Sequence, residues 1–85
     1  MKIVYFASLR RQIGVAEEVI DLPGEIDRVD HLIDWLKQRS PAHRAALDAC
    51  GRVLVAIDQD YARYDQRLAG AAEVALFPPV TGGTK

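Results

Sequence analysis

Apolar residues alternate with polar ones near the N-terminus and predict two neighbouring strands. Residues 2–7 are rich in β-branched and aromatic side chains, and the alternation places Lys2, Val4 and Phe6 on one face. The polar stretch 8–14 predicts a turn, and residues 17–22 predict a second strand that ends at Pro23–Gly24. Two strands this close in sequence indicate a hairpin.

Four apolar residues recur at the spacing of one helical face and predict an amphipathic helix: Val29, Leu32, Ile33 and Leu36. We expect Asp27 to cap its N-terminus, because a short carboxylate accepts hydrogen bonds from the free amides of the first turn. Ser40–Pro41 then predicts the end of this helix and the start of a shorter one, which runs to about Ala49.

Three more strands are predicted in the second half of the chain. The β-branched run 52–58 is typical of a buried central strand, residues 61–64 of a short edge strand, and residues 73–77 of the last strand. Pro78–Pro79 must end the last strand, because proline has no amide hydrogen to donate to the ladder. The alternation turns Val74 and Leu76 inward and Phe77 outward.

The order of these elements predicts one small α+β domain, residues 1–79, followed by a flexible C-terminal tail, residues 80–85. We expect a mixed sheet with one main helix packed on one face. The other face is then free to meet a partner, and apolar side chains on it need not belong to the core.

Composition narrows the classes of function. With 11 Lys and Arg against 12 Asp and Glu, the net charge of −1 gives no reason to expect nucleic-acid binding. No apolar run approaches the roughly 20 residues that span a bilayer, so we expect no membrane association. The single cysteine, Cys50, cannot form an internal disulfide, which favours a reducing cytoplasm.

The candidate catalytic side chains are few. His31 and His43 have no Cys or carboxylate at ligand spacing, so we expect surface residues and no metal site. Cys50 has no nearby base to activate it and is better interpreted as a small buried hydrophobic side chain. Arg10 and Arg11 are equally compatible with two solvated residues and with a docking role.

The C-terminal run after Phe77 is the least ordinary feature of the sequence. Two prolines favour an extended path, and Gly82–Gly83 lack the Cβ atoms that would obstruct a narrow channel. This composition is typical of a tail that is inserted into a partner. A frayed terminus remains an equal alternative on these residues alone.

Several motifs resemble those of the molybdopterin synthase small subunits, also called small subunits of molybdopterin-converting factor. The opening Phe6-Ala7-Ser8-Leu9-Arg10 with Gly14, and the strand Val55-Ala56-Ile57-Asp58-Gln59, are similar to the family's motifs. The ending Glu73-Val74-Ala75-Leu76-Phe77-Pro78-Pro79-Val80-Thr81-Gly82-Gly83 is the most specific match. The resemblance covers essentially the whole chain and implies a β-grasp (ubiquitin-like) fold.

The resemblance also implies a role as a non-catalytic sulfur carrier in molybdenum cofactor biosynthesis. The Gly83 carboxylate would be adenylated by an activating enzyme that uses ATP, and converted to a thiocarboxylate that donates sulfur to cyclic pyranopterin monophosphate. The large subunit of the synthase, in a heterotetramer, and the activating enzyme would be the partners, with no cofactor or metal bound to the carrier itself. The resemblance assigns partner contacts to Phe6, Arg10, Tyr61, Phe77, Pro78, Pro79, Val80 and Thr81, and the chemistry to Gly82 and Gly83.

Two features depart from the family pattern. Thr84 and Lys85 follow Gly83, and a glycine in a peptide bond has no free carboxylate to activate. Asp58 stands where the family often has asparagine.

Two alternative functions stay open. One is a sulfur carrier of another pathway, such as thiamine synthesis or tRNA thiolation, and the other is a ubiquitin-like interaction module that carries no sulfur.

Overall fold

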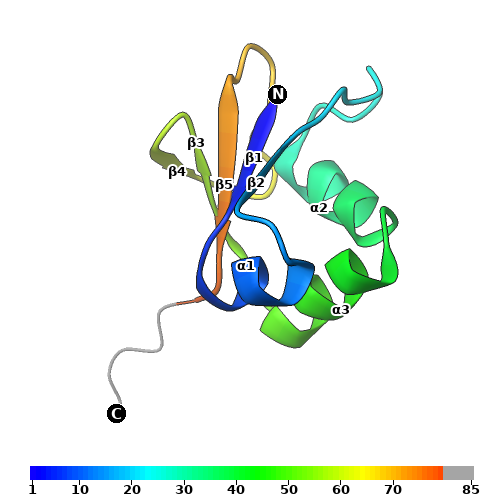
Figure 1. The fold of residues 1–85 in the computed structure, drawn as a ribbon. Helices are drawn as coiled ribbons and strands as arrows, with labels where there is room; N and C mark the ends of the chain where they lie inside the picture. The colour runs from blue at the N-terminus through cyan, green and yellow to red at the C-terminus, as the bar shows by residue number, and fades with distance from the viewer. Residues whose placement is uncertain (80–85) are drawn as a thin grey trace.

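The computed structural model describes residues 1–79, which form a five-stranded mixed sheet and three helices. The strands lie in the order β2-β1-β5-β3-β4; β1 and β5 are parallel, and the other neighbours are antiparallel. This arrangement confirms the predicted α+β, ubiquitin-like fold (Figure 1). The elements are β1 (Lys2–Tyr5), α1 (Ala7–Ile13), β2 (Glu17–Val19), α2 (Val29–Lys37), α3 (Pro41–Cys50), β3 (Leu54–Ile57), β4 (Asp60–Ala62) and β5 (Glu73–Phe77).

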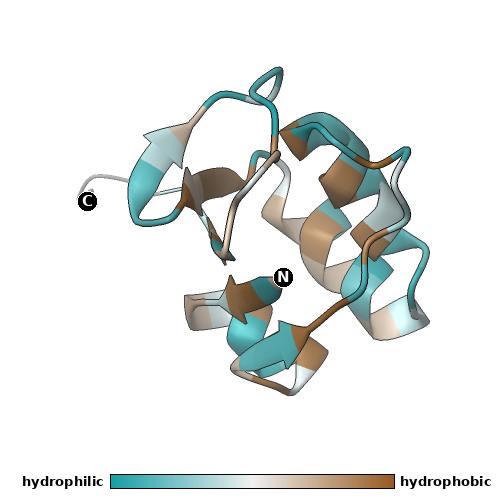
Figure 2. Ribbon diagram, turned by 90° about the horizontal axis from the view of Figure 1, so that it is seen from above, coloured by the Kyte–Doolittle hydropathy of each residue, from teal (hydrophilic) through white to brown (hydrophobic). Residues whose placement is uncertain are grey.

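The core lies between the sheet and the helical layer. Seen from above, the sheet lies on one side and α2 and α3 on the other (Figure 2). The predicted inward residues of α2 are buried, as are Val74 and Leu76 of β5, while Phe77 is only half-buried. Trp35 packs at the rim of the same cluster. None of the helices within residues 1–79 is long and apolar enough to cross a membrane.

The segment predicted to be a turn, residues 8–14, is the helix α1, so that prediction was wrong. Leu, Arg and Gln favour helices, and Leu9 is completely buried, which anchors the short helix to the core. Gly14 ends α1 with φ = 96°, a left-handed conformation that glycine adopts without strain. The chain therefore leaves β1 at Phe6 and returns through a helix to β2.

The first two strands pair as predicted, but both are shorter than predicted. β1 and β2 are antiparallel neighbours, with Lys2 opposite Val19 and Val4 opposite Glu17. The amide of Ile20 still donates to the carbonyl of Met1 at 2.8 Å. β2 ends at Val19, so residues 20–22 of the predicted strand lie outside it.

The N-terminus of α2 is capped by main-chain carbonyls and not by Asp27. The amides of Val29 and Asp30 donate to the carbonyls of Gln66 and Tyr64, at 3.0 and 2.9 Å. The Asp27 carboxylate instead accepts from Arg67 at 2.7 Å. The sequence pattern favoured a local cap, whereas a distant loop satisfies these amides.

The second predicted helix corresponds to α3, and this helix and the last strands largely agree with prediction. Ser40 caps α3 by accepting from the amide of His43 at 3.1 Å, and β5 has the predicted bounds. β4 begins one residue early, at Asp60, because Asp58 and Gln59, both with positive φ, form a two-residue hairpin turn. The Asp58 carboxylate steadies this turn by accepting from the amides of Ala72 and Glu73 at 3.1 and 3.0 Å.

Candidate functional site at the C-terminal end of the sheet

Three aromatic rings lie in a row on the face of the sheet that no helix covers. Phe6 stacks on Phe77 with ring centroids 5.0 Å apart, and Phe77 contacts Tyr61 with centroids 5.9 Å apart. Phe6 and Tyr61 are 43% and 75% exposed. We call Phe6, Phe77 and Tyr61 the aromatic strip. It brings together three residues to which the resemblance assigned partner contacts.

The register of the sheet explains how the strip forms. β1 and β5 run parallel with Tyr5 beside Leu76, so the next residues, Phe6 and Phe77, also become neighbours. The amide of Phe6 donates to the carbonyl of Leu76 at 3.1 Å and holds this alignment. Immediately afterwards, Ala7 adopts a positive φ of 52°, an uncommon conformation for a residue with a Cβ, and turns the chain into α1.

Small residues beside the strip leave room for partner side chains. Ala56 of β3 pairs with Ala75 of β5, and both are nearly buried despite facing the uncovered side. They line a shallow hollow of about 310 Å³ together with the aromatic strip. An apolar hollow with aromatic walls is typical of an anchor point in a protein interface.

The remaining predicted contact residues lie where the chain leaves the sheet. Arg10 is exposed in the last turn of α1, and its amide donates to the carbonyl of Phe6 at 3.4 Å. Pro78 and Pro79 follow β5 and are half-buried. Val80, Thr81, Gly82 and Gly83 lie outside the described residues. The partner roles of all these residues stay predictions.

A partly buried polar network on the helix side was not predicted. Glu18 accepts hydrogen bonds from the Tyr5 hydroxyl at 2.6 Å and from Nε2 of His43 at 2.7 Å, and Arg39 lies 3.2 Å from its other oxygen. Ser40 Oγ lies 2.7 Å from Nδ1 of His43. His43 is therefore buried, not at the surface as predicted, whereas His31 is exposed.

The network shifts the ionisation of its members. Burial would raise the pKa of Glu18, but the hydrogen bonds from Tyr5 and His43 outweigh it and hold that pKa below its usual value. Burial, followed by the hydrogen bond to Glu18, raises the pKa of Tyr5. Glu18 thus stays ionised and ties β2 to β1 and to α3.

Two sequence signals pointed to this network. Glu18 precedes the buried Ile20 by two residues, and alternation in a strand turns both side chains to the same face, where a carboxylate needs partners. His43 precedes the buried Ala46 and Leu47 by three and four residues, on one face of α3. Neither signal indicates chemistry with a substrate.

Other reactive side chains in the described part of the chain lack catalytic surroundings. Cys50 is half-buried, and burial raises the pKa of its thiol, which disfavours the nucleophilic thiolate. Within residues 1–79, no three His, Cys, Asp or Glu side chains gather in a way that could hold a metal ion.

Comparisons with known proteins agree with this geometry. The model of the ThiS family matches residues 3–83. The molybdopterin synthase sulfur carrier subunit of Escherichia coli (strain K12) is 31% identical over 98% of this chain and 99% of that protein.

Solved structures give the same fold. A Pyrococcus furiosus protein described as molybdopterin converting factor, subunit 1, is 36% identical with a TM-score of 0.72, over 93% of this chain and 95% of that one. The small archaeal modifier protein 1 of Haloferax volcanii is 27% identical with a TM-score of 0.66, over the same shares of the two chains. The chain therefore belongs to the ThiS family, and the resemblance to molybdopterin synthase small subunits that its motifs indicated is confirmed.

Proposed function

We propose that this chain is the sulfur carrier subunit of a molybdopterin synthase. The observation that carries the proposal is the aromatic strip, an uncovered apolar anchor placed where the chain leaves the sheet toward Gly82–Gly83. The full-length similarity to molybdopterin synthase sulfur carrier subunits supports it. The strip binds the large subunit, and the C-terminal residues deliver sulfur.

The chemistry takes place at Gly83. A free Gly83 carboxylate attacks the α-phosphorus of ATP and releases pyrophosphate, which leaves an acyl-adenylate with AMP as the leaving group. A sulfide-equivalent donor then displaces AMP and forms the thiocarboxylate. Without activation a carboxylate is a poor acceptor, so the adenylating partner supplies the nucleotide site and the carrier needs no base of its own.

The C-terminal segment is long enough for the carrier to deliver its reactive carboxylate to a site on the partner. Residues 80–83, when extended, reach about 13–14 Å beyond Pro79, which is far enough to enter a narrow site while the domain stays outside. The absence of side chains at Gly82 and Gly83 reduces the width that a channel must accommodate. The match to the family model also ends at Gly83, so we propose that Thr84 and Lys85 are removed before activation.

The proposed assembly rests on the family resemblance, and the proposed compartment rests on the sulfur chemistry. We propose that two carriers bind a dimer of large subunits in a heterotetramer, and that the complex works in the cytoplasm. A reducing compartment protects the thiocarboxylate sulfur, which is as open to oxidation as a thiolate.

A second function shares the first step. The structural likeness to small archaeal modifier protein 1 favours a modifier, whose activated glycine would form an amide bond with a lysine of another protein. The two functions diverge after adenylation, because one passes on sulfur and the other passes on the whole chain.

An experiment separates them. The chain ending at Gly83 is converted to its thiocarboxylate and mixed with the large subunit and cyclic pyranopterin monophosphate. A sulfur carrier yields molybdopterin and returns as the free carboxylate, with its own mass otherwise unchanged. A modifier yields no molybdopterin but forms higher-mass conjugates when incubated with activating enzyme, ATP and cell protein.

A further inference from the structure

A groove beside β4 adjoins the aromatic strip. It has a volume of about 620 Å³, and its lining includes Arg52, Leu54, Tyr61, Arg63 and Tyr64. Tyr61 lines this groove and also the hollow over Ala56 and Ala75, so the two surfaces are continuous. Nothing in the proposed sulfur chemistry uses this groove.

Arg52 is an unpaired cation in this groove. Within residues 1–79 every lysine and arginine forms an ion pair with a carboxylate except Arg10, Arg11 and Arg52. Arg52 is also exposed. A surface arginine without a partner costs nothing in the free protein, but it is available to a carboxylate that approaches from outside.

The Arg52 guanidinium is held in place by an aromatic ring. Its central carbon lies 5.7 Å from the ring centroid of Tyr64. Tyr64 is fixed in turn, because its hydroxyl accepts from the amide of Val53 at 3.0 Å and donates to the carbonyl of the same residue. A guanidinium that lies over an aromatic ring keeps N–H groups that point away from the ring, and these can bind a carboxylate with two hydrogen bonds.

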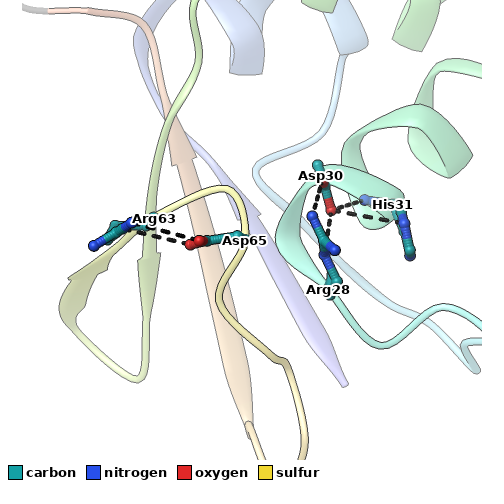
Figure 3. A network of polar contacts seen from close by, with 5 residues as sticks. All are labelled: Arg28, Asp30, His31, Arg63 and Asp65. Carbon is teal, nitrogen blue, oxygen red and sulfur yellow. Dashed lines mark hydrogen bonds and ion pairs between the residues drawn. The ribbon is translucent and has the colours of Figure 1, made fainter.

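The carboxylates around the groove are already engaged. Figure 3 shows Asp30 facing Arg28 and His31, and Asp65 facing Arg63. The Arg28–Asp30 contact is 2.6 Å, and the Arg28 guanidinium and the amide of His31 help to hold the pKa of Asp30 below its usual value in spite of the effect of desolvation. Arg63 is 85% exposed in its 3.4 Å pair with Asp65, so it can turn to a stronger partner. Among the charged residues that line the groove, Arg52 is therefore the cation without a carboxylate partner within residues 1–79.

We propose that this groove is a second contact surface for the protein that binds the aromatic strip, and that it receives an acidic segment of that protein. Arg52 forms a two-bond contact with an Asp or Glu of the segment, Arg63 adds a weaker contact, and Tyr61 joins the groove to the apolar anchor. The inference rests on the proposed function, because it takes the large subunit of molybdopterin synthase as the partner.

The test measures the dissociation constant for the large subunit from the same organism by titration calorimetry, at low and at high ionic strength. Arg52→Glu should weaken binding about tenfold or more at low ionic strength, and salt should reduce that loss because it screens the charges. Arg63→Glu should also weaken binding, and this substitution does not remove the contact between Arg52 and the Tyr64 ring. Arg52→Lys keeps the charge but loses the two-bond contact, so its affinity should fall between those of the unaltered chain and Arg52→Glu.

The matched control is Arg44→Glu, a charge reversal on α3 at an exposed residue that already pairs with Asp48. It should bind like the unaltered chain. The inference is overturned if Arg52→Glu and Arg63→Glu bind normally, if Arg52→Lys is as weak as Arg52→Glu, or if Arg44→Glu weakens binding equally.

The same titrations distinguish a failure of the groove assignment from a failure of the proposed function. If the unaltered chain binds and Phe77→Ala does not, while Arg52→Glu is normal, only the groove assignment fails. If the unaltered chain does not bind the large subunit at all, the proposed function fails and the groove assignment fails with it.

Discussion

Replacing Phe77 by alanine removes the centre of the aromatic strip. Phe77 contacts Phe6 on one side and Tyr61 on the other, at centroid distances of 5.0 and 5.9 Å. Truncation takes away the apolar anchor and leaves both neighbours without their ring partner. Central aromatic residues of an interface contribute roughly 2 kcal/mol or more, so the dissociation constant for the large subunit should rise about 30-fold.

The fold should survive the same substitution. Full burial makes Phe→Ala cost about 3–5 kcal/mol, and Phe77 is only half-buried, so we expect a loss of roughly 1–2 kcal/mol in the free energy of unfolding. Small domains have about 5–15 kcal/mol in total, so the variant should remain folded. The large effect on binding and the small effect on stability distinguish an interface residue from a core residue.

The assay pairs calorimetric titration of the large subunit with denaturant unfolding of the free carrier. Val15→Ala is the matched control, because Val15 is exposed to the same extent as Phe6, 43%, but lies in the connection between α1 and β2. Val15→Ala should change neither the affinity for the large subunit nor the free energy of unfolding noticeably. An unchanged affinity for Phe77→Ala, or a Phe77→Ala chain that is unfolded, would refute the assignment of the strip.

Three further predictions concern the core, the polar network and the C-terminal segment. Leu36→Ala should lower the free energy of unfolding by about 2–5 kcal/mol, because Leu36 is fully buried in α2; an unmoved denaturation midpoint contradicts this. The pKa of Glu18 is lowered, so its charge stabilises the fold above about pH 4–5, and this stability is lost as the pH falls through the folded pKa. Glu18→Gln should therefore be less stable than the unaltered chain at neutral pH and should lose less stability on acidification. Parallel stability–pH curves for the two chains would exclude this role. Gly82→Ala in a chain ending at Gly83 should slow adenylation, measured by pyrophosphate release, because the added Cβ narrows the accessible φ range and the clearance; equal rates contradict a narrow channel.

Periodicity located most elements because their patterns are local. The spacing of Val29 to Leu36 identified the buried face of α2, and the apolar run that ends at two prolines identified β5 with its bounds. Phe77 was correctly turned away from the core, because alternation in a strand depends only on the strand itself.

The errors arose where distant residues decide the structure. α1 is only seven residues long and is held by the burial of Leu9, which no short polar stretch reveals. The cap of α2 comes from carbonyls more than 30 positions along the chain, and His43 is buried because Glu18, 25 positions away, supplies its partner. The aromatic strip and the Arg52 groove likewise depend on sheet register, which the order of strands along the chain does not determine.

Intact-mass spectrometry can show whether Gly83 carries sulfur. The chain ending at Gly83 and the 85-residue chain are each incubated with the cognate activating enzyme, ATP and a sulfide source. We expect the shorter chain to gain the mass difference between sulfur and oxygen only when ATP is present, and fragmentation should place the gain at Gly83. The 85-residue chain should gain nothing until Thr84 and Lys85 are removed. A thiocarboxylate formed at Lys85, or molybdopterin synthesis by the 85-residue chain with its mass unchanged by processing, would contradict the account.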